Sequence, residues 1–242
     1  MQITKDNNDV SCAADSSDSC DSDGSAFNYR ESLKKPDHSF LNKVIKVERY
    51  LNRPLAALIV RLVYKTPITP NGLTFFSFFL GILGAFFLSR GKYIYFILGG
   101  IGIQLSSIMD CADGMLARSK NMCSEYGAHL DIFLDRIMDF SMIIGVSVGV
   151  YTALDNKIFL MLGFLAAGLY LLQVNLFYLT NSYLQRKEKG QTGEARAMML
   201  LAVMILALAN RLDIGIYLLL AEAVVVNIIR TIHFISLGKK RS

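Results

Sequence analysis

Long apolar segments without charged side chains constrain this fold more than any other feature of the chain. Residues 72–89 form a run of 18 uncharged residues, and comparable apolar runs follow as far as residue 235. An α-helix needs about 20 apolar residues to cross the hydrocarbon core of a bilayer. In that core only helices and closed barrels satisfy every backbone hydrogen bond. With 53% hydrophobic residues overall, the sequence predicts an all-α integral membrane protein.

Turn signals and basic loops divide the apolar part into six predicted transmembrane helices. The fifth run has only 13 residues, which is short for a complete span. Lysine and arginine gather before the first run, in the loop before the fifth run and at the end of the chain, and the positive-inside rule places such segments in the cytoplasm. We therefore expect a multi-pass protein of the cell membrane with both termini cytoplasmic. The six predicted spans are 72–89, 93–109, 130–154, 158–180, 197–209 and 214–235.

Composition divides the chain into three predicted regions. Residues 1–36 are acidic and poor in apolar side chains, which predicts a disordered tail. Residues 37–67 alternate apolar and basic side chains at helical spacing, as in an amphipathic helix at the membrane interface, and Pro54 should start or kink a helical segment there. Residues 68–238 hold the six-helix transmembrane domain. The basic charge suits anionic membrane lipids rather than nucleic acid, because it lies in short loops and tails.

Four aspartates between the second and third runs are the candidate site. Asp110 and Asp113 are three residues apart, and Asp131 and Asp135 are four apart, so each pair shares one face of a helix. Carboxylates at the edge of a bilayer are costly unless they are paired, hydrated or bound to a cation. Four converging carboxylates form a hard-oxygen site suited to Mg²⁺ or Mn²⁺. The four cysteines lack zinc-site spacing.

The pattern of these residues resembles the CDP-alcohol phosphotransferase family, whose motif is D-x2-D-G-x2-A-R-x8-G-x3-D-x3-D. The resemblance implies transfer of a substituted phosphate from a CDP-alcohol donor to an acceptor alcohol, release of CMP, and a homodimer that makes a phospholipid or phospho-polyol. An intramembrane cation transporter is the alternative, because buried carboxylates also mark ion paths. A phosphate-binding arginine between two glycines argues against that alternative. The eight fixed positions are filled by Asp110, Asp113, Gly114, Ala117, Arg118, Gly127, Asp131 and Asp135.

By the same resemblance, all four aspartates bind the metal and Asp135 is also the general base. The expected nucleotide-binding residues surround the aspartates in sequence. For Asn71 and Thr74 a helix-start role is an equal alternative, and for Ser124 a solvated loop position is one. The full set of expected CDP-alcohol contacts is Asn71, Thr74, Gly114, Ala117, Arg118, Ser124 and Gly127.

The sequence constrains the identity of the acceptor alcohol least. The segments N-R-P, T-P-I-T-P-N and E-A-R (194–196) loosely resemble the branch that makes inositol-phosphate lipids and di-inositol phosphates. Arg196, at the start of the fifth run, could bind the phosphate of such an acceptor, or could be an interfacial arginine. Glycerol phosphate and serine remain alternative acceptors. Asp139, one turn beyond Asp135, is expected to make a structural contact.

Overall fold

The computed structural model describes residues 48–184 and 192–241, and within these ranges every regular element is a helix. The predicted tail, residues 1–36, lies outside the described residues, as do the first part of the predicted amphipathic segment and residues 185–191. The all-α prediction is confirmed. The elements are η1 (Glu48–Asn52, a π-helical turn), α3 (Arg53–Val63), α4 (Pro70–Leu88), α5 (Tyr93–Ser119), α6 (Glu125–Leu154), α7 (Ile158–Leu184), α8 (Thr192–Leu208) and α9 (Leu212–Arg241).

Five described helices, namely α4, α5, α6, α7 and α9, are long and apolar enough to cross a membrane. This confirms a multi-pass membrane protein. The apolar part of α8, Arg196–Leu208, is shorter. At 1.5 Å per residue it extends about 20 Å, against a hydrocarbon core of about 30 Å. The predicted fifth span, residues 197–209, therefore falls in a helix of less than membrane-spanning length, and the count of six spans stays a prediction.

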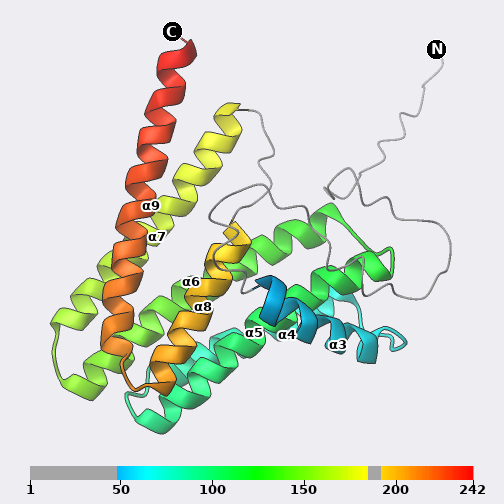
Figure 1. Ribbon diagram of the computed structural model, residues 1–242, viewed down its shortest axis with the longest axis horizontal. Helices are drawn as coiled ribbons and strands as arrows, with labels where there is room; N and C mark the ends of the chain where they lie inside the picture. Colours follow the sequence, from blue (N-terminus) through cyan, green and yellow to red (C-terminus); the bar gives the residue numbers. More distant parts are fainter. Residues whose placement is uncertain (1–47, 185–191, 242) are drawn as a thin grey trace.

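The helices pack as a bundle in which α4, α5 and α6 form one group and α7 lies along α9 (Figure 1). The helix α8 packs mainly against α5 and thereby reaches the group that carries the aspartates. Close contact between α4 and α5 depends on glycine. A Cβ atom on Gly84 would lie 3.0 Å from the carbonyl oxygen of Gly99. The shared core includes Leu88, Ile103, Met142, Val146 and Leu200, all fully buried.

The segment before the first long helix is anchored to α5 by a buried polar contact. Asn52 is fully buried; its amide nitrogen donates to Ser107 Oγ (2.9 Å), and its amide oxygen accepts from Gln104 Nε2 (2.8 Å). The helix α3 begins directly afterwards, with Pro54 in its first turn, as the sequence predicts. It buries alanines against α5 and exposes Leu58 and other leucines. Its place at the membrane interface remains a prediction.

The start of α4 follows the chemistry that its sequence predicts. Thr69 is the N-cap and its hydroxyl accepts a hydrogen bond from the amide of Gly72, while Pro70 occupies the first turn. The preceding connection is held by Lys120 at the end of α5. Its ammonium group donates to the carbonyl oxygens of Thr66 and Ile68, each at 2.8 Å. The residues that open α4 are thereby fixed relative to α5.

Candidate active site

The last turns of α5 and the first turns of α6 bring the four motif aspartates together. Asp110 and Asp113 lie on α5, which continues past the predicted end of the span at residue 109 as far as Ser119. The connection to α6 is short and ends at Ser124, whose hydroxyl caps α6 by accepting from the amide of Gly127 at 3.0 Å. Because the chain reverses within these few residues, both carboxylate pairs lie at the same end of the bundle.

Three of the aspartates, Asp110, Asp113 and Asp131, form a tight cluster. Each offers a carboxylate oxygen within 4.8 Å of the others'. Asp113 is only 5% exposed. Both Oδ2 of Asp113 and Oδ1 of Asp131 are buried without a hydrogen-bond partner. Carboxylate oxygens that are buried, close together and without hydrogen-bond donors fit a hard divalent cation. Such an ion would supply the positive charge that these carboxylates need.

Asp135 lies outside this cluster and forms an ion pair with Arg196, which also reaches Asp110. One terminal guanidinium nitrogen of Arg196, Nη2, is 2.8 Å from Asp135 Oδ1, and the other, Nη1, is 3.3 Å from Asp110 Oδ2. The Arg196 side chain reaches the site from α8 and is 13% exposed. The structure thus places Arg196 among the carboxylates, where its guanidinium balances part of their charge.

Two side chains that the motif does not contain complete this side of the site. Asp139, expected only as a structural contact, accepts from Nε of Arg196 with both of its oxygens, at 3.0 and 3.1 Å. Tyr170 of α7 donates to Asp139 Oδ2 at 2.6 Å. No sequence pattern pointed to Tyr170, because it lies 31 residues from Asp139 on another helix.

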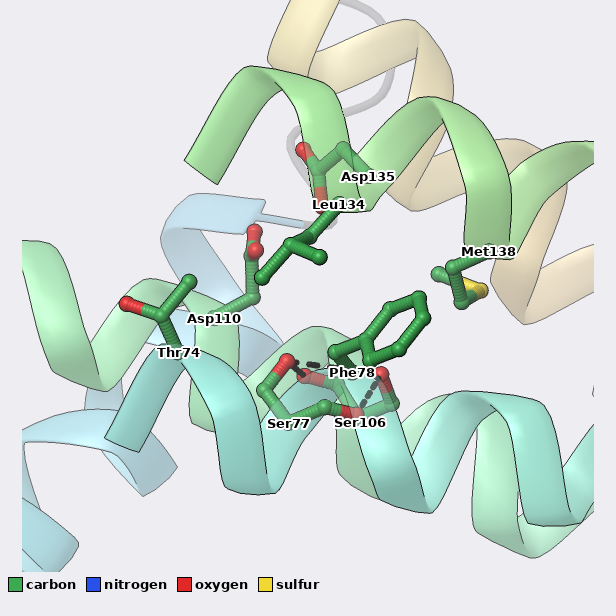
Figure 2. A pocket seen from close by; sticks show the side chains of 8 residues that line it. All are labelled: Thr74, Ser77, Phe78, Ser106, Asp110, Leu134, Asp135 and Met138. Atoms are coloured by element: carbon green, nitrogen blue, oxygen red, sulfur yellow. Dashed lines mark hydrogen bonds between the residues drawn. The ribbon is translucent and has the colours of Figure 1, made fainter. Parts of the chain in front are cut away.

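A small pocket adjoins the aspartates between α4, α5 and α6 (Figure 2). Asp110 and Asp135 line it from different helices. Ser77 and Ser106 also line it, and they join α4 to α5 through two hydrogen bonds: Ser77 Oγ donates to the Ser106 carbonyl (3.1 Å), and Ser106 Oγ donates to the Ser77 carbonyl (2.8 Å). No pattern in the sequence pointed to these serines. The other lining residues are Thr74, Phe78, Leu134 and Met138.

Several predicted nucleotide-binding residues also come together. A Cβ atom on Gly127 would lie 2.9 Å from Ser124 Oγ and 3.0 Å from Asn71 Oδ1, so the start of α4 meets the start of α6. Thr74 is buried in the pocket and donates to the carbonyl of Pro70 at 3.2 Å. Ser124 is exposed, as its solvated alternative predicts, and it is also the N-cap of α6, whereas the N-cap of α4 is Thr69 rather than Asn71 or Thr74.

The motif arginine stands beside a motif glycine on α5. Arg118 is exposed, and a Cβ atom on Gly114 would lie 3.6 Å from its Nη1, with no nearer neighbour in the described part of the chain. Ala117 precedes Arg118 and is half-buried. The surface next to Asp113 therefore presents open backbone and an exposed guanidinium group on one side of the carboxylate cluster.

Comparison with known proteins agrees with this geometry. The family model described as CDP-alcohol phosphatidyltransferase matches residues 67–230. A bifunctional IPC transferase and DIPP synthase of Rubrobacter xylanophilus is 40% identical over 108 residues, which cover 45% of this chain and 24% of that protein. An archaetidylinositol phosphate synthase of Pyrococcus horikoshii is 27% identical over 152 residues, 62% of this chain and 75% of that protein.

A third relative, a phosphatidylinositol phosphate synthase of Mycobacteroides abscessus, is 27% identical over 96 residues, which cover 40% of this chain and 41% of that protein. The match to the bifunctional protein of Rubrobacter xylanophilus spans only about a quarter of its length.

Proposed function

Because the chain belongs to the CDP-alcohol phosphatidyltransferase family, we propose that it transfers a substituted phosphate group from a CDP-alcohol to an acceptor alcohol and releases CMP. The observation that carries this proposal is the cluster of Asp110, Asp113 and Asp131, with buried carboxylate oxygens that lack partners, next to the exposed Arg118. The cluster lies within the proposed catalytic domain, residues 68–238. The cation-transporter alternative does not account for an exposed guanidinium group beside open backbone.

The donor binds on the α4 and α5 side of the site in this proposal. Asp110, Asp113 and Asp131, with Asp135 as a shared ligand, would hold Mg²⁺ or Mn²⁺, which supplies charge neutralisation at the donor diphosphate. Arg118 grips a phosphate through its planar fork. Gly114 lets the diphosphate approach the backbone. The cytidine part lies against Asn71, Thr74 and Ser124, with Ala117 and Gly127 leaving room for the pyrimidine.

The acceptor reacts on the α6 and α8 side. Asp135 takes the proton of the acceptor hydroxyl as its oxygen attacks the β-phosphorus of the donor. The bond between that phosphorus and the oxygen bridging to the α-phosphate breaks, and CMP leaves with the bonding electrons. The ion pair with Arg196 at 2.8 Å supports this role, because it orients the Asp135 carboxylate. In this proposal Arg196 also contacts a phosphate on the acceptor.

Inositol phosphate is the proposed acceptor and a CDP-lipid the proposed donor. The relatives from Pyrococcus horikoshii and Mycobacteroides abscessus are named as inositol-phosphate lipid synthases, which supports this choice. Glycerol phosphate and serine are the alternative acceptors. We also propose a homodimer in the cell membrane, with the site and both termini on the cytoplasmic side, following the basic loops.

A CMP-release assay tests the proposal directly. Purified protein in detergent with Mg²⁺ is given CDP-diacylglycerol, CDP-archaeol or CDP-inositol, each with inositol phosphate, glycerol phosphate or serine. We expect CMP only from pairs that contain a CDP-lipid and inositol phosphate. If CMP is released only with glycerol phosphate or only with serine, that alcohol is the acceptor instead of inositol phosphate. No CMP from any pair, together with no binding of CDP, would reject the family reaction for this chain.

A further inference from the structure

Asp139 is a buried carboxylate that the proposed reaction does not use. It lies on α6 one turn beyond Asp135, and its side chain is 1% exposed. A carboxylate so deep in a membrane helix is costly unless its charge is paired and its oxygens are hydrogen-bonded. Both conditions are met here, because Asp139 has partners on α8, on α7 and on α6 itself.

The contact with Asp139 uses the Nε edge of the Arg196 guanidinium group and leaves the terminal nitrogens available for other carboxylates. Both oxygens of Asp139 accept from Nε, at 3.0 and 3.1 Å. The terminal nitrogens then lie toward Asp110 and Asp135, at 3.3 and 2.8 Å. Because the guanidinium group is planar and rigid, fixing Nε fixes the direction of both terminal nitrogens.

Asp139 is itself held by a hydrogen bond from α7. The hydroxyl of Tyr170 on α7 donates to Asp139 Oδ2 at 2.6 Å, and it accepts from Nη1 of Arg136 at 2.9 Å. Arg136 Nη1 also lies 3.8 Å from Asp139 Oδ2. A continuous polar chain therefore runs from α7 through α6 to α8 and ends at the carboxylates where the acceptor is proposed to react.

We propose that Asp139 is a positioning residue, which holds Arg196 by its Nε edge so that the terminal nitrogens face Asp110 and Asp135, with Tyr170 holding Asp139 in turn. The inference rests on the proposed function for its kinetic consequence. A misplaced Arg196 loses both the orientation of Asp135 and any contact with an acceptor phosphate. The nucleotide contacts on α4 and the Arg118 turn of α5 are not partners of Asp139 or Arg196, so at saturating Mg²⁺ they should keep their geometry.

The kinetic test compares Asp139→Asn and Tyr170→Phe with the unmodified protein, using dioleoyl CDP-diacylglycerol and inositol phosphate. Asp139→Asn removes a charge-assisted contact, so kcat/KM for the acceptor should fall about ten- to 100-fold. Tyr170→Phe removes the hydrogen bonds to Asp139 and from Arg136, of which only the first acts on Asp139 directly, and should reduce kcat/KM about three- to tenfold. The donor KM should stay within about twofold in both. Ser147→Ala, a buried polar change further along α6, is the control and should leave all constants unchanged.

A double-mutant cycle separates positioning from a general structural effect. Asp139→Asn is made in the native chain and in Arg196→Ala, and its effect is measured on CMP release and on Mn²⁺ affinity without substrate. Without the Asp139 contact, Arg196 should pair more strongly with Asp110 and Asp135 and so compete with Mn²⁺ for their carboxylate oxygens. We therefore expect Mn²⁺ affinity to fall about three- to tenfold in the native background and less than about twofold in Arg196→Ala.

The two readouts also separate this inference from the proposed function. No CMP release by the native protein would reject the reaction, and the Mn²⁺ cycle would still decide whether Asp139 acts through Arg196. Equal effects of Asp139→Asn in both backgrounds would overturn the inference. So would unchanged acceptor kinetics in Asp139→Asn, or a matching rise in donor KM. If Asp139→Asn does not fold, the milder Tyr170→Phe variant carries the same cycle.

Discussion

Replacing Lys120 with methionine should weaken donor binding although this side chain touches none of the proposed substrate contacts. Lys120 donates to the carbonyl oxygens of Thr66 and Ile68, both at 2.8 Å. These bonds hold the connection that leads into the N-cap Thr69 and on to Asn71, which lies against Gly127. Methionine is one atom shorter than lysine and keeps most of its apolar stem but removes the donor, so the connection should lose its fixed position.

The size of the effect follows from the partial exposure of this group. Hydrogen bonds to a charged donor contribute about 1.5–3 kcal/mol when buried. Lys120 is half-buried, so we discount each bond to about 1 kcal/mol for solvent screening. Losing both costs about 2 kcal/mol, which raises the donor KM about 30-fold if the loss falls on donor binding.

The assay is CMP release at saturating acceptor with the donor concentration varied, and then the reverse. The acceptor KM should stay within about twofold, because Arg196 and Asp135 lie on the other side of the site. Lys157→Met, at an exposed lysine in the short connection between α6 and α7, is the matched control and should change neither constant. An unchanged donor KM in Lys120→Met, or an equal rise in both constants, would refute the reasoning.

Four further predictions concern the site and the tail. Asp135→Asn should abolish CMP release while CDP still binds in calorimetry, and near-normal turnover would remove it as the base. Activity should disappear in excess EDTA and return with Mg²⁺ or Mn²⁺; full activity in the chelator would exclude the metal. Arg196→Ala should raise the acceptor KM about ten- to 150-fold in steady-state kinetics and leave the donor KM nearly unchanged, and loss of both affinities would mean that it supports the whole site. Deleting residues 1–36 should leave turnover in detergent unchanged, and a large loss would assign the tail to the catalytic domain.

Local patterns in the sequence predicted the parts of the fold that depend on local physics. Runs of uncharged residues gave the long helices, and Pro70 after Thr69 gave the start of α4. The 3.6-residue period placed Asp110 with Asp113 and Asp131 with Asp135. These features could be predicted because each depends on neighbours in the chain. The length of α8 relative to the bilayer was harder, because its short apolar run is compatible with either a span or a core helix.

Contacts between helices distant in sequence could not be predicted in the same way. Ser77 and Ser106 are 29 residues apart, yet they join α4 to α5 beside the pocket. Tyr170 reaches Asp139 from α7, and Asn52 meets α5 across more than 50 residues. A lone serine, tyrosine or asparagine in an apolar segment carries no periodic signal, so only the packing of the bundle reveals its partner.

The pairing of Asp135, the fourth motif aspartate, could not be predicted from the motif. In the sequence all four carboxylates are equivalent members of one spaced pattern. In the structure three of them gather, and two of these, Asp113 and Asp131, have a buried oxygen without a partner. Asp135 instead lies 2.8 Å from a terminal nitrogen of Arg196, whose other terminal nitrogen is 3.3 Å from Asp110. A carboxylate paired with arginine is already compensated, so it has less need of a cation than its neighbours have. This asymmetry supports a division in which the cluster serves the donor diphosphate and the pair serves the acceptor hydroxyl. The same asymmetry depends on Asp139, which binds Nε of Arg196. Without that contact the guanidinium group could turn toward any of the four carboxylates and neutralise it.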